Sequence, residues 1–200
     1  MKIQPLSIEG AWTVEPEQHT DSRGVFLEWY RADRLAEVTG HEFHIAQANL
    51  SVSARGVVRG IHFADVPPGQ AKYVICVRGA VLDVVVDLRV GSPTYGRWEA
   101  VPLNDVQRRG VYLGDGLGHG FCALTDDAVV SYLCSTSYDP TREHAVHPFD
   151  EELGIDWLVD TPSASARDAA APTLARLREA GLLPRYDRCR PAGAIPPDAG

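Results

Sequence analysis

Strict two-residue alternation at residues 81–90 constrains the fold of this chain more than any other feature of its sequence. Every even-numbered position from 82 to 90 is Leu or Val, whereas the odd-numbered positions include Asp83, Asp87 and Arg89. Because successive side chains of a strand point to opposite faces, this pattern predicts a strand with one apolar face. We interpret its second, charged face as a functional surface.

Short β-rich runs recur along the chain at spacings of about ten residues, separated by Gly, Pro, Asn and Asp, which is typical of sandwiches and barrels. We therefore predict an all-β, cupin-like jelly-roll barrel or sandwich with a few short peripheral helices. Helices are expected at 32–39, before Gly40, and at 173–180, between Pro172 and Gly181. Besides 81–90, the expected strands are residues 24–30, 45–52, 57–63, 73–78, 98–101, 110–113, 120–124 and 128–135.

Composition limits the organisation and the partners of the chain. With 200 residues, 44% of them hydrophobic, it fits one jelly-roll domain over residues 1–187. Residues 188–200, rich in Pro, Ala and Gly, are expected to form a flexible tail. A net charge of -8 argues against nucleic-acid or anionic-membrane partners, and no apolar run is long enough to span a bilayer. We therefore expect a cytoplasmic protein with reduced cysteines, since its four cysteines form no CxxC pair.

The segment RGVVRGIH at residues 55–62 places charged side chains in an otherwise apolar strand. Its glycines allow a ligand or another backbone to approach closely, so we interpret the segment as a binding surface. The alternative is an edge strand with solvated arginines. Strict alternation puts Arg59 and His62 on opposite faces, so both reach one pocket only if the strand bulges near Gly60 or if two subunits contribute.

His62 fits the role of a base better than that of a metal ligand. Cupin metal sites usually contain two histidines at HxH spacing and a nearby glutamate, but His62 is followed by neither, and the next glutamate is Glu99. A glycine-rich turn at residues 114–118 delivers a second histidine, His119, to the start of a strand. We expect no metal site and no cofactor, including at the HxxH pair of His41 and His44, which is assigned to a loop.

Several ordered motifs between residues 21 and 183 resemble those of the dTDP-4-dehydrorhamnose 3,5-epimerases and the related epimerases of antibiotic deoxysugar pathways. DSRGVFLE at residues 21–28 is similar to the family's DxRGxFxE, and RGVVRGIH at 55–62 to its KGVLRGLH. QAN at 47–49 resembles its QxN, and PPGQAK at 67–72 its lysine-bearing stretch. DVVVDLRVGSPTYGRW at 83–98 is similar almost position by position to its DVAVDIRxGSPTFGKW.

The resemblance implies a homodimeric jelly-roll enzyme that epimerises a dTDP-linked 4-keto-6-deoxy sugar. His62 would be the base, paired with Asp168, while Tyr132 would be the acid on the opposite face of the ring and Lys72 would stabilise the enolate oxygen. Arg23 and Glu28 would reach the neighbouring subunit's pocket. The residues expected to bind the substrate are Arg23, Phe26, Glu28, Gln47, Asn49, Arg59, Asp83, His119 and Arg167.

Several alternatives stay open at this point. Asp83 competes with Asp168 as the partner of His62, Asp168 could instead cap a short helix, Tyr132 could be a core residue, and Lys72 could be solvated. Departures from the family's motifs, including the proline missing from residues 114–121, resemble monoepimerases, so inversion at C3, at C5 or at both is left open. A ketoisomerase and a non-catalytic sugar-nucleotide-binding domain are the alternative functions.

Overall fold

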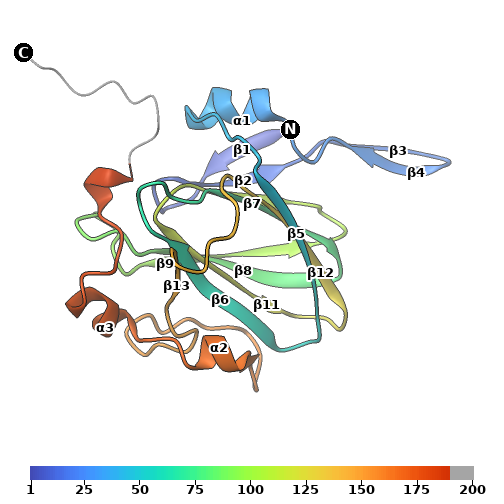
Figure 1. Ribbon diagram of the computed structural model, residues 1–200. Helices are drawn as coiled ribbons and strands as arrows, with labels where there is room; N and C mark the ends of the chain where they lie inside the picture. The colour runs from blue at the N-terminus through green and yellow to red at the C-terminus, as the bar shows by residue number, and fades with distance from the viewer. Residues whose placement is uncertain (190–200) are drawn as a thin grey trace, which may run out of the picture.

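Two antiparallel sheets face each other in the computed structural model, which describes residues 1–189 (Figure 1). The order of strands in the first sheet is β1-β2-β10-β7-β12-β5, and in the second β13-β6-β11-β8-β9. The first comprises β1 (Lys2–Pro5), β2 (Ala11–Glu15), β10 (Gly110–Leu113), β7 (Lys72–Arg78), β12 (Ala128–Cys134) and β5 (Gln47–Ser53). The second comprises β13 (Glu143–Ala145), β6 (Val57–Ala64), β11 (Leu117–Ala123), β8 (Ala80–Asp87) and β9 (Trp98–Asn104).

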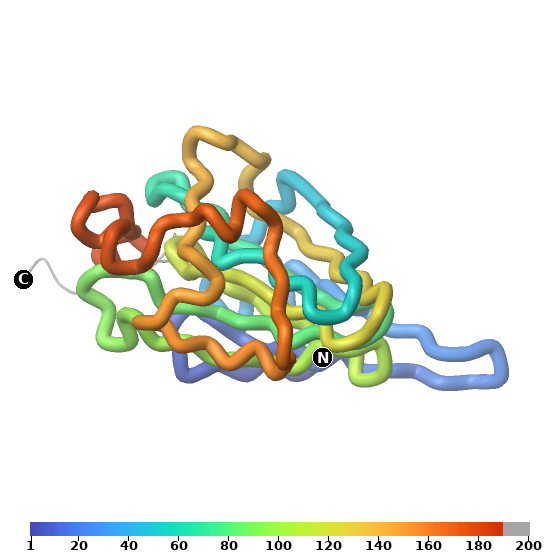
Figure 2. Tube along the Cα trace, turned by 90° about the horizontal axis from the view of Figure 1, so that it is seen from below, coloured from blue at the N-terminus to red at the C-terminus, as the bar shows by residue number. Residues whose placement is uncertain are grey.

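The remaining elements lie at the edges of this sandwich. A hairpin of β3 (Gln18–Asp21) and β4 (Gly24–Leu27) projects from the body of the molecule in both views (Figures 1 and 2). β14 (Ser163–Ala164) pairs with β6 in parallel. The helices are α1 (Ala32–Thr39), α2 (Ala166–Ala169), α3 (Leu174–Glu179) and the 3-10 helix η1 (Tyr186–Arg188). None of the helices within residues 1–189 is long and apolar enough to cross a membrane.

The main core fills part of the space between the two sheets. Val74 and Val111 contribute to it from the first sheet, and Val85 and Phe121 from the second. The odd-numbered side of β8 therefore faces the interior of the sandwich, and it carries Asp83 into that interior. This arrangement confirms the two-faced strand that the alternation at residues 81–90 predicts, although β8 ends earlier, at Asp87.

Two further apolar clusters cover the outer faces of the sheets. On the second sheet, Val84 and Val86 from the even-numbered side of β8 pack under Trp157 and Leu174 of the C-terminal segment. That segment runs across the outside of the sheet in Figure 2. On the first sheet, α1 and the chain before it pack against Tyr73 and its neighbours. Apolar packing thus occurs on both outer faces as well as between the sheets, and polar side chains occupy the part of the interior that the main core does not fill.

The prediction of an all-β jelly-roll with peripheral helices is confirmed, and α1 has the predicted bounds. Gly40 ends α1 in the left-handed conformation with φ 72°, as the glycine stop signal predicts. Thr173 caps α3 by accepting a hydrogen bond from the Arg176 backbone N–H. The expected strand at 24–30 ends earlier, at Leu27, and β1, β2, β3, β13, β14 and α2 were not predicted.

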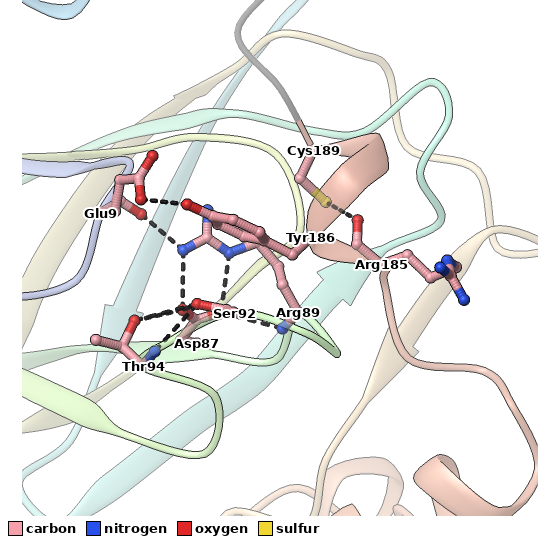
Figure 3. Close-up of polar contacts among 8 residues, drawn as sticks. All are labelled: Glu9, Asp87, Arg89, Ser92, Thr94, Arg185, Tyr186 and Cys189. Atoms are coloured by element: carbon pink, nitrogen blue, oxygen red, sulfur yellow. Dashed lines mark hydrogen bonds and ion pairs between the residues drawn. The ribbon is translucent and has the colours of Figure 1, made fainter. Parts of the chain in front are cut away.

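The interpretation of Asp87 and Arg89 as part of a functional surface is wrong, because both are fully occupied in a structural network (Figure 3). The Asp87 carboxylate accepts hydrogen bonds from the Arg89 guanidinium, at 2.8 and 2.9 Å, and from the hydroxyls of Ser92 and Thr94. Arg89 also donates to the backbone carbonyl of Glu9 and lies under the ring of Tyr186. The network joins the N-terminal segment, the end of β8 and η1.

Arg188 ends η1, so the beginning of the expected flexible tail is part of an ordered turn. Most of that expected tail, residues 190–200, lies outside the described residues. Cys76, Cys122 and Cys134 are buried in strands, and all four cysteines are free thiols.

Candidate active site

A β-bulge in β6 brings Arg59 and His62 to the same face of the sheet. His62 is opposite His119 of β11, and Arg59 is opposite Phe121, so β6 has one more residue than β11 between these pairs. Phe121 belongs to the core between the sheets, which places Arg59 and His62 on the interior side. The bulge is the first of the two ways in which both side chains were expected to reach one pocket.

Glycines make the bulge possible. Gly60 has φ 119°, a conformation that L side chains rarely adopt. A Cβ atom on Gly60 would lie 2.6 Å from the Cα of Gly120 on β11, and a Cβ on Gly120 would lie 2.6 Å from Ile61 Cδ1. Any side chain at either position would push β6 and β11 apart. Gly60 and Gly120 therefore allow β6 and β11 to approach each other closely.

His62 is paired with the carboxylate of Asp168. The distance from His62 Nε2 to Asp168 Oδ1 is 2.8 Å, and the Asp168 residue is 5% exposed. Ser165 caps α2 by accepting a hydrogen bond from the Asp168 backbone N–H, which fixes the position of this residue in the first turn. Burial alone would raise the pKa of Asp168, but the hydrogen bond and charge of His62 and the contact with Ser165 outweigh it and lower the pKa. Asp168 itself is not the helix cap.

Asp83, the alternative partner of His62, is hydrogen-bonded to the second histidine. The distance from His119 Nε2 to Asp83 Oδ2 is 2.7 Å, and both side chains are buried. Since His62 and His119 are opposite each other on neighbouring strands, two histidine–aspartate pairs lie side by side in the interior. His119 is therefore deep in the barrel beside His62.

Lys72 and Tyr132 enter the same interior from the opposite sheet. Lys72 is opposite Cys134, and Val74, two residues later on β7, belongs to the core between the sheets. Tyr132 packs against that core. Burial lowers the pKa of the Lys72 ammonium, partly offset by Cys134, Glu143 and Asp83, and burial raises the pKa of the Tyr132 hydroxyl. Both side chains therefore lie inside the sandwich. The alternative that Lys72 is solvated is wrong.

Every second residue of β5 places a polar side chain in this interior. Gln47 is opposite Cys134 and Asn49 is opposite Tyr132, and the Gln47 amide donates to Asn49 Oδ1 at 2.8 Å. Arg59 crosses from β6 and donates through Nε to the Ser53 hydroxyl at 3.0 Å. The described side chains thus form one polar cluster between the sheets, contributed by β5, β6, β7, β8, β11 and β12, which we call the polar chamber.

Arg23, Phe26 and Glu28 do not join this chamber within one chain. Arg23 is at the tip of the projecting β3–β4 hairpin, where its side chain is 88% exposed and paired with Asp21. Phe26 is 68% exposed, and Glu28 pairs with Arg31 near α1. These residues are available to a neighbouring molecule.

Two residues near the chamber were missed by sequence reasoning. Tyr138 donates its backbone N–H to Gln47 Oε1 at 2.8 Å, and its hydroxyl accepts from the predicted residue Arg167 at 3.2 Å. Glu143, on the edge strand β13, accepts from Gln70 at 3.2 Å and acts electrostatically on Lys72. Neither residue lies in a motif used above, and only the pairing of distant segments reveals them.

The arrangement has the parts of a general acid–base site. A histidine oriented by a carboxylate faces the interior from one sheet, and a protonated tyrosine and a buried lysine face it from the other. Such groups can remove a proton, stabilise the resulting anion and supply a proton from another direction. Within residues 1–189, no group of three His, Cys, Asp or Glu side chains is placed to hold a metal ion.

Comparison with known proteins identifies the family. The family model described as dTDP-4-dehydrorhamnose 3,5-epimerase matches residues 5–176. The chain belongs to this family. It is therefore an isomerase of the epimerase class. A dTDP-4-dehydrorhamnose 3-epimerase from Streptomyces niveus is 62% identical over 200 residues, which cover 100% of this chain and 97% of that relative.

Solved structures of family members have the same fold. A 4-keto-6-deoxy sugar epimerase from the novobiocin biosynthetic gene cluster of Streptomyces spheroides superposes with a TM-score of 0.94 at 64% identity, covering 95% of this chain and 96% of that one. A 3'-monoepimerase from Streptomyces bikiniensis in complex with dTDP-quinovose gives a TM-score of 0.90 at 55% identity, covering 92% and 94%. The family and the cupin-like jelly-roll expected from the sequence are thus confirmed.

Proposed function

We propose that this enzyme epimerises a dTDP-linked 4-keto-6-deoxyhexose next to its C4 ketone. The observation that carries the proposal is the placement of the His62–Asp168 pair and of Tyr132 and Lys72 on opposite sheets of one polar chamber. Relatives named above are 3-epimerases or belong to a family described as 3,5-epimerases, so C3 is the position common to their names. Inversion at C3 is accordingly our first assignment, with C5 as a second position.

His62 removes the carbon-bound proton in this proposal. A proton beside a ketone is weakly acidic, so its removal needs a base held close to the carbon. The hydrogen bond to Asp168 orients the imidazole and stabilises its protonated form after the transfer. Because the pKa of Asp168 is lowered, this carboxylate stays charged while His62 accepts the proton.

Lys72 stabilises the negative charge that develops on the C4 oxygen. A preorganised donor at such an oxyanion is typically worth about 3 kcal/mol of transition-state stabilisation. His119 is close enough to His62 to contact the sugar as well. That position favours contact with the keto-sugar as the substrate-binding role of His119.

Tyr132 returns a proton to the opposite face of the ring. The phenol stays protonated at neutral pH, because burial raises its pKa. Inversion results because the base and the acid enter from different sheets. This chemistry uses only side chains of the protein, without a metal or an organic cofactor.

The nucleotide is bound at the end of the chamber formed by β5 and the bulged part of β6. Gln47, Asn49 and Arg59 present amides and a guanidinium there, which suit the pyrimidine and the diphosphate. Arg167 and Tyr138 are linked to Gln47 by hydrogen bonds and extend the same surface.

A second copy of the chain completes the site through the β3–β4 hairpin. Arg23 and Phe26 lie on the projecting hairpin and Glu28 follows it, and none of them contacts the chamber of their own chain. The Arg23 side chain and the Phe26 ring are exposed. Leu50 and Val52, which are 65% and 54% exposed on β5, offer an apolar surface to a partner. Sedimentation of a homodimer would support this arrangement, and a monomer that is fully active would contradict it.

Proton NMR of the reaction in deuterated water tests the proposed function. Incubation of the enzyme with dTDP-4-keto-6-deoxyglucose should replace the C3 proton by deuterium and invert C3, while the ketone stays at C4. Migration of the ketone would indicate a ketoisomerase instead. An unchanged spectrum together with dTDP binding would indicate a sugar-nucleotide-binding protein without catalysis.

A further inference from the structure

One carboxylate oxygen of the buried residue Asp83 has no hydrogen-bond partner. The residue is 0% exposed, and its Oδ2 is engaged with His119 at 2.7 Å. Its Oδ1 is one of four buried side-chain atoms in residues 1–189 that lack a hydrogen bond. A buried charged oxygen without a donor is unfavourable, so such an atom in a folded protein calls for a donor nearby.

Lys72 is the complementary group in the same chamber. The residue is 7% exposed, and among residues 1–189 its ammonium forms no ion pair with Asp83 or with any other carboxylate. An ammonium has three donors and no acceptor, and it sits on a flexible four-carbon stem that can rotate. Two buried groups of opposite charge, both short of partners, therefore face each other from β7 and β8.

The other groups around Lys72 are less suited to pair with it. Cys134 faces it from β12, but burial raises the pKa of this thiol and keeps it neutral. Glu143 acts on it from β13 and raises the pKa of Lys72 more than Asp83 does, but that carboxylate already accepts from Gln70 at 3.2 Å and lies at the edge of the sheet. His62, His119 and Tyr132 line the same chamber, and none carries a permanent negative charge. Asp83 is thus the fully buried anion with a free oxygen.

We infer that Asp83 is a positioning residue that holds His119 through Oδ2 and bridges the two sheets. The Lys72 ammonium does not contact Asp83 in this structure, and rotation of its side chain brings it to Oδ1. The bridge keeps Lys72 protonated at a buried position and fixes it beside His62 and His119. Its catalytic value rests on the proposed function, in which Lys72 faces the C4 oxygen. The bridge itself is a property of the free protein and is testable without substrate.

The lysine content of the chain makes a direct test possible. The sequence contains only two lysines, Lys2 and Lys72, so protein labelled with lysine carrying carbon-13 at Cε gives two side-chain signals. A Lys2→Arg variant assigns them. Titration of the Lys72 signal with pH then reports the protonation of the ammonium, and the exposed Lys2 serves as an internal reference.

Asp83→Asn should lower the pKa of Lys72 by at least about one unit, a tenfold weaker hold on the proton, because a nearby negative charge favours the protonated form. Asn keeps the shape and an acceptor for His119. Glu143 acts on Lys72 more strongly than Asp83 does in the unbridged arrangement of this structure, but once the bridge forms the matched control Glu143→Gln should lower the pKa by less than Asp83→Asn. An unchanged Lys72 titration in Asp83→Asn, or a larger change in Glu143→Gln, would overturn the inference.

A crystal structure of the unmodified protein provides a second measurement that does not depend on the variant folding. Lys72 Nζ within hydrogen-bond distance of Asp83 Oδ1 supports the bridge, and a water or another side chain on Oδ1 in place of Lys72 overturns it. If the Lys72 titration responds to Asp83→Asn but the enzyme produces no epimerised sugar, the bridge stands and the proposed function fails.

Discussion

At the scale of single residues, each histidine of the chamber has its own carboxylate. His62 contacts Asp168 at 2.8 Å and His119 contacts Asp83 at 2.7 Å, although the first pair is separated by 106 positions in sequence. The two histidine–aspartate pairs have different roles in our account. One orients the base, and the other belongs to the group of residues that holds the charge of the oxyanion.

Asp168→Asn tests the electrostatic part of the first pair. The folded pKa of Asp168 is lowered from 3.8, so its charged form stabilises the native state above that value, and this stabilisation is lost as pH falls through the lowered pKa. Urea unfolding should therefore show Asp168→Asn less stable than the wild type at neutral pH, with the difference shrinking in acid below 3.8. A difference that is constant down to the lowest measurable pH would contradict this account.

Tyr132→Phe separates proton removal from inversion. Without the phenol, His62 can still take the C3 proton and return solvent deuterium to the same face, so exchange should persist. Formation of the inverted sugar should fall by about a hundredfold or more, the usual range for loss of a general acid. Both rates are read from one NMR time course. Equal losses of exchange and inversion would argue against Tyr132 as the opposite-face donor.

At the scale of elements, the bulge in β6 decides which side chains meet. Local pattern alone predicted the strand at residues 57–63 and identified Gly60 as the place where a bulge was needed, but it left a contribution from two subunits open. The choice depends on the register with β11, where Gly60 lies against Gly120. Pairings between strands distant in sequence are not encoded in a short window of residues.

Gly60→Ala tests the bulge, with Gly96→Ala as the matched control. Both glycines have positive φ, 119° and 75°, but a Cβ on Gly96 meets nothing within 4 Å. Gly96→Ala should cost about 1 kcal/mol of unfolding free energy through backbone strain alone. Gly60→Ala should cost clearly more and should abolish epimerisation, because β6 must separate from β11. Equal losses of stability in urea melts would contradict the steric argument.

The difference between local sequence pattern and pairing of distant segments explains which elements and site residues could be predicted. α1 follows from local periodicity and a glycine stop and has the expected bounds, whereas the two-faced strand β8 follows from its alternation but ends at Asp87, before the expected residue 90. β3 was missed because QHTD at residues 18–21 is exposed and has no apolar face. Asp168, Tyr132 and Lys72 came from the family resemblance. Tyr138 and Glu143 became visible only when distant segments were brought together.

At the scale of the whole molecule, the charged residues Asp87 and Arg89 at the end of β8 stabilise the fold. The network around Asp87 and Arg89 fastens the N-terminal segment and η1 to the end of β8 (Figure 3). η1 closes the C-terminal segment, which covers the second sheet and delivers Asp168 to His62. The network thus stabilises the scaffold that carries the His62–Asp168 pair, our proposed base and its partner.

Asp87→Ala should destabilise the fold by about 3–5 kcal/mol, because it leaves the Arg89 guanidinium, 3% exposed, buried without its counter-charge. Thermal melts should show a large fall in Tm. The control is Glu152→Ala, which breaks the exposed pair with Arg178 and should leave Tm nearly unchanged. A small effect of Asp87→Ala, comparable to that of the control, would contradict the structural role of the network.

Deuterium exchange catalysed by His62→Ala is the most direct test of the central claim that His62 is the base. With dTDP-4-keto-6-deoxyglucose in deuterated water, the wild type should exchange the C3 proton rapidly, and His62→Ala should reduce this exchange by at least about a hundredfold while binding of dTDP is kept. Exchange at the wild-type rate in His62→Ala would remove His62 from the reaction.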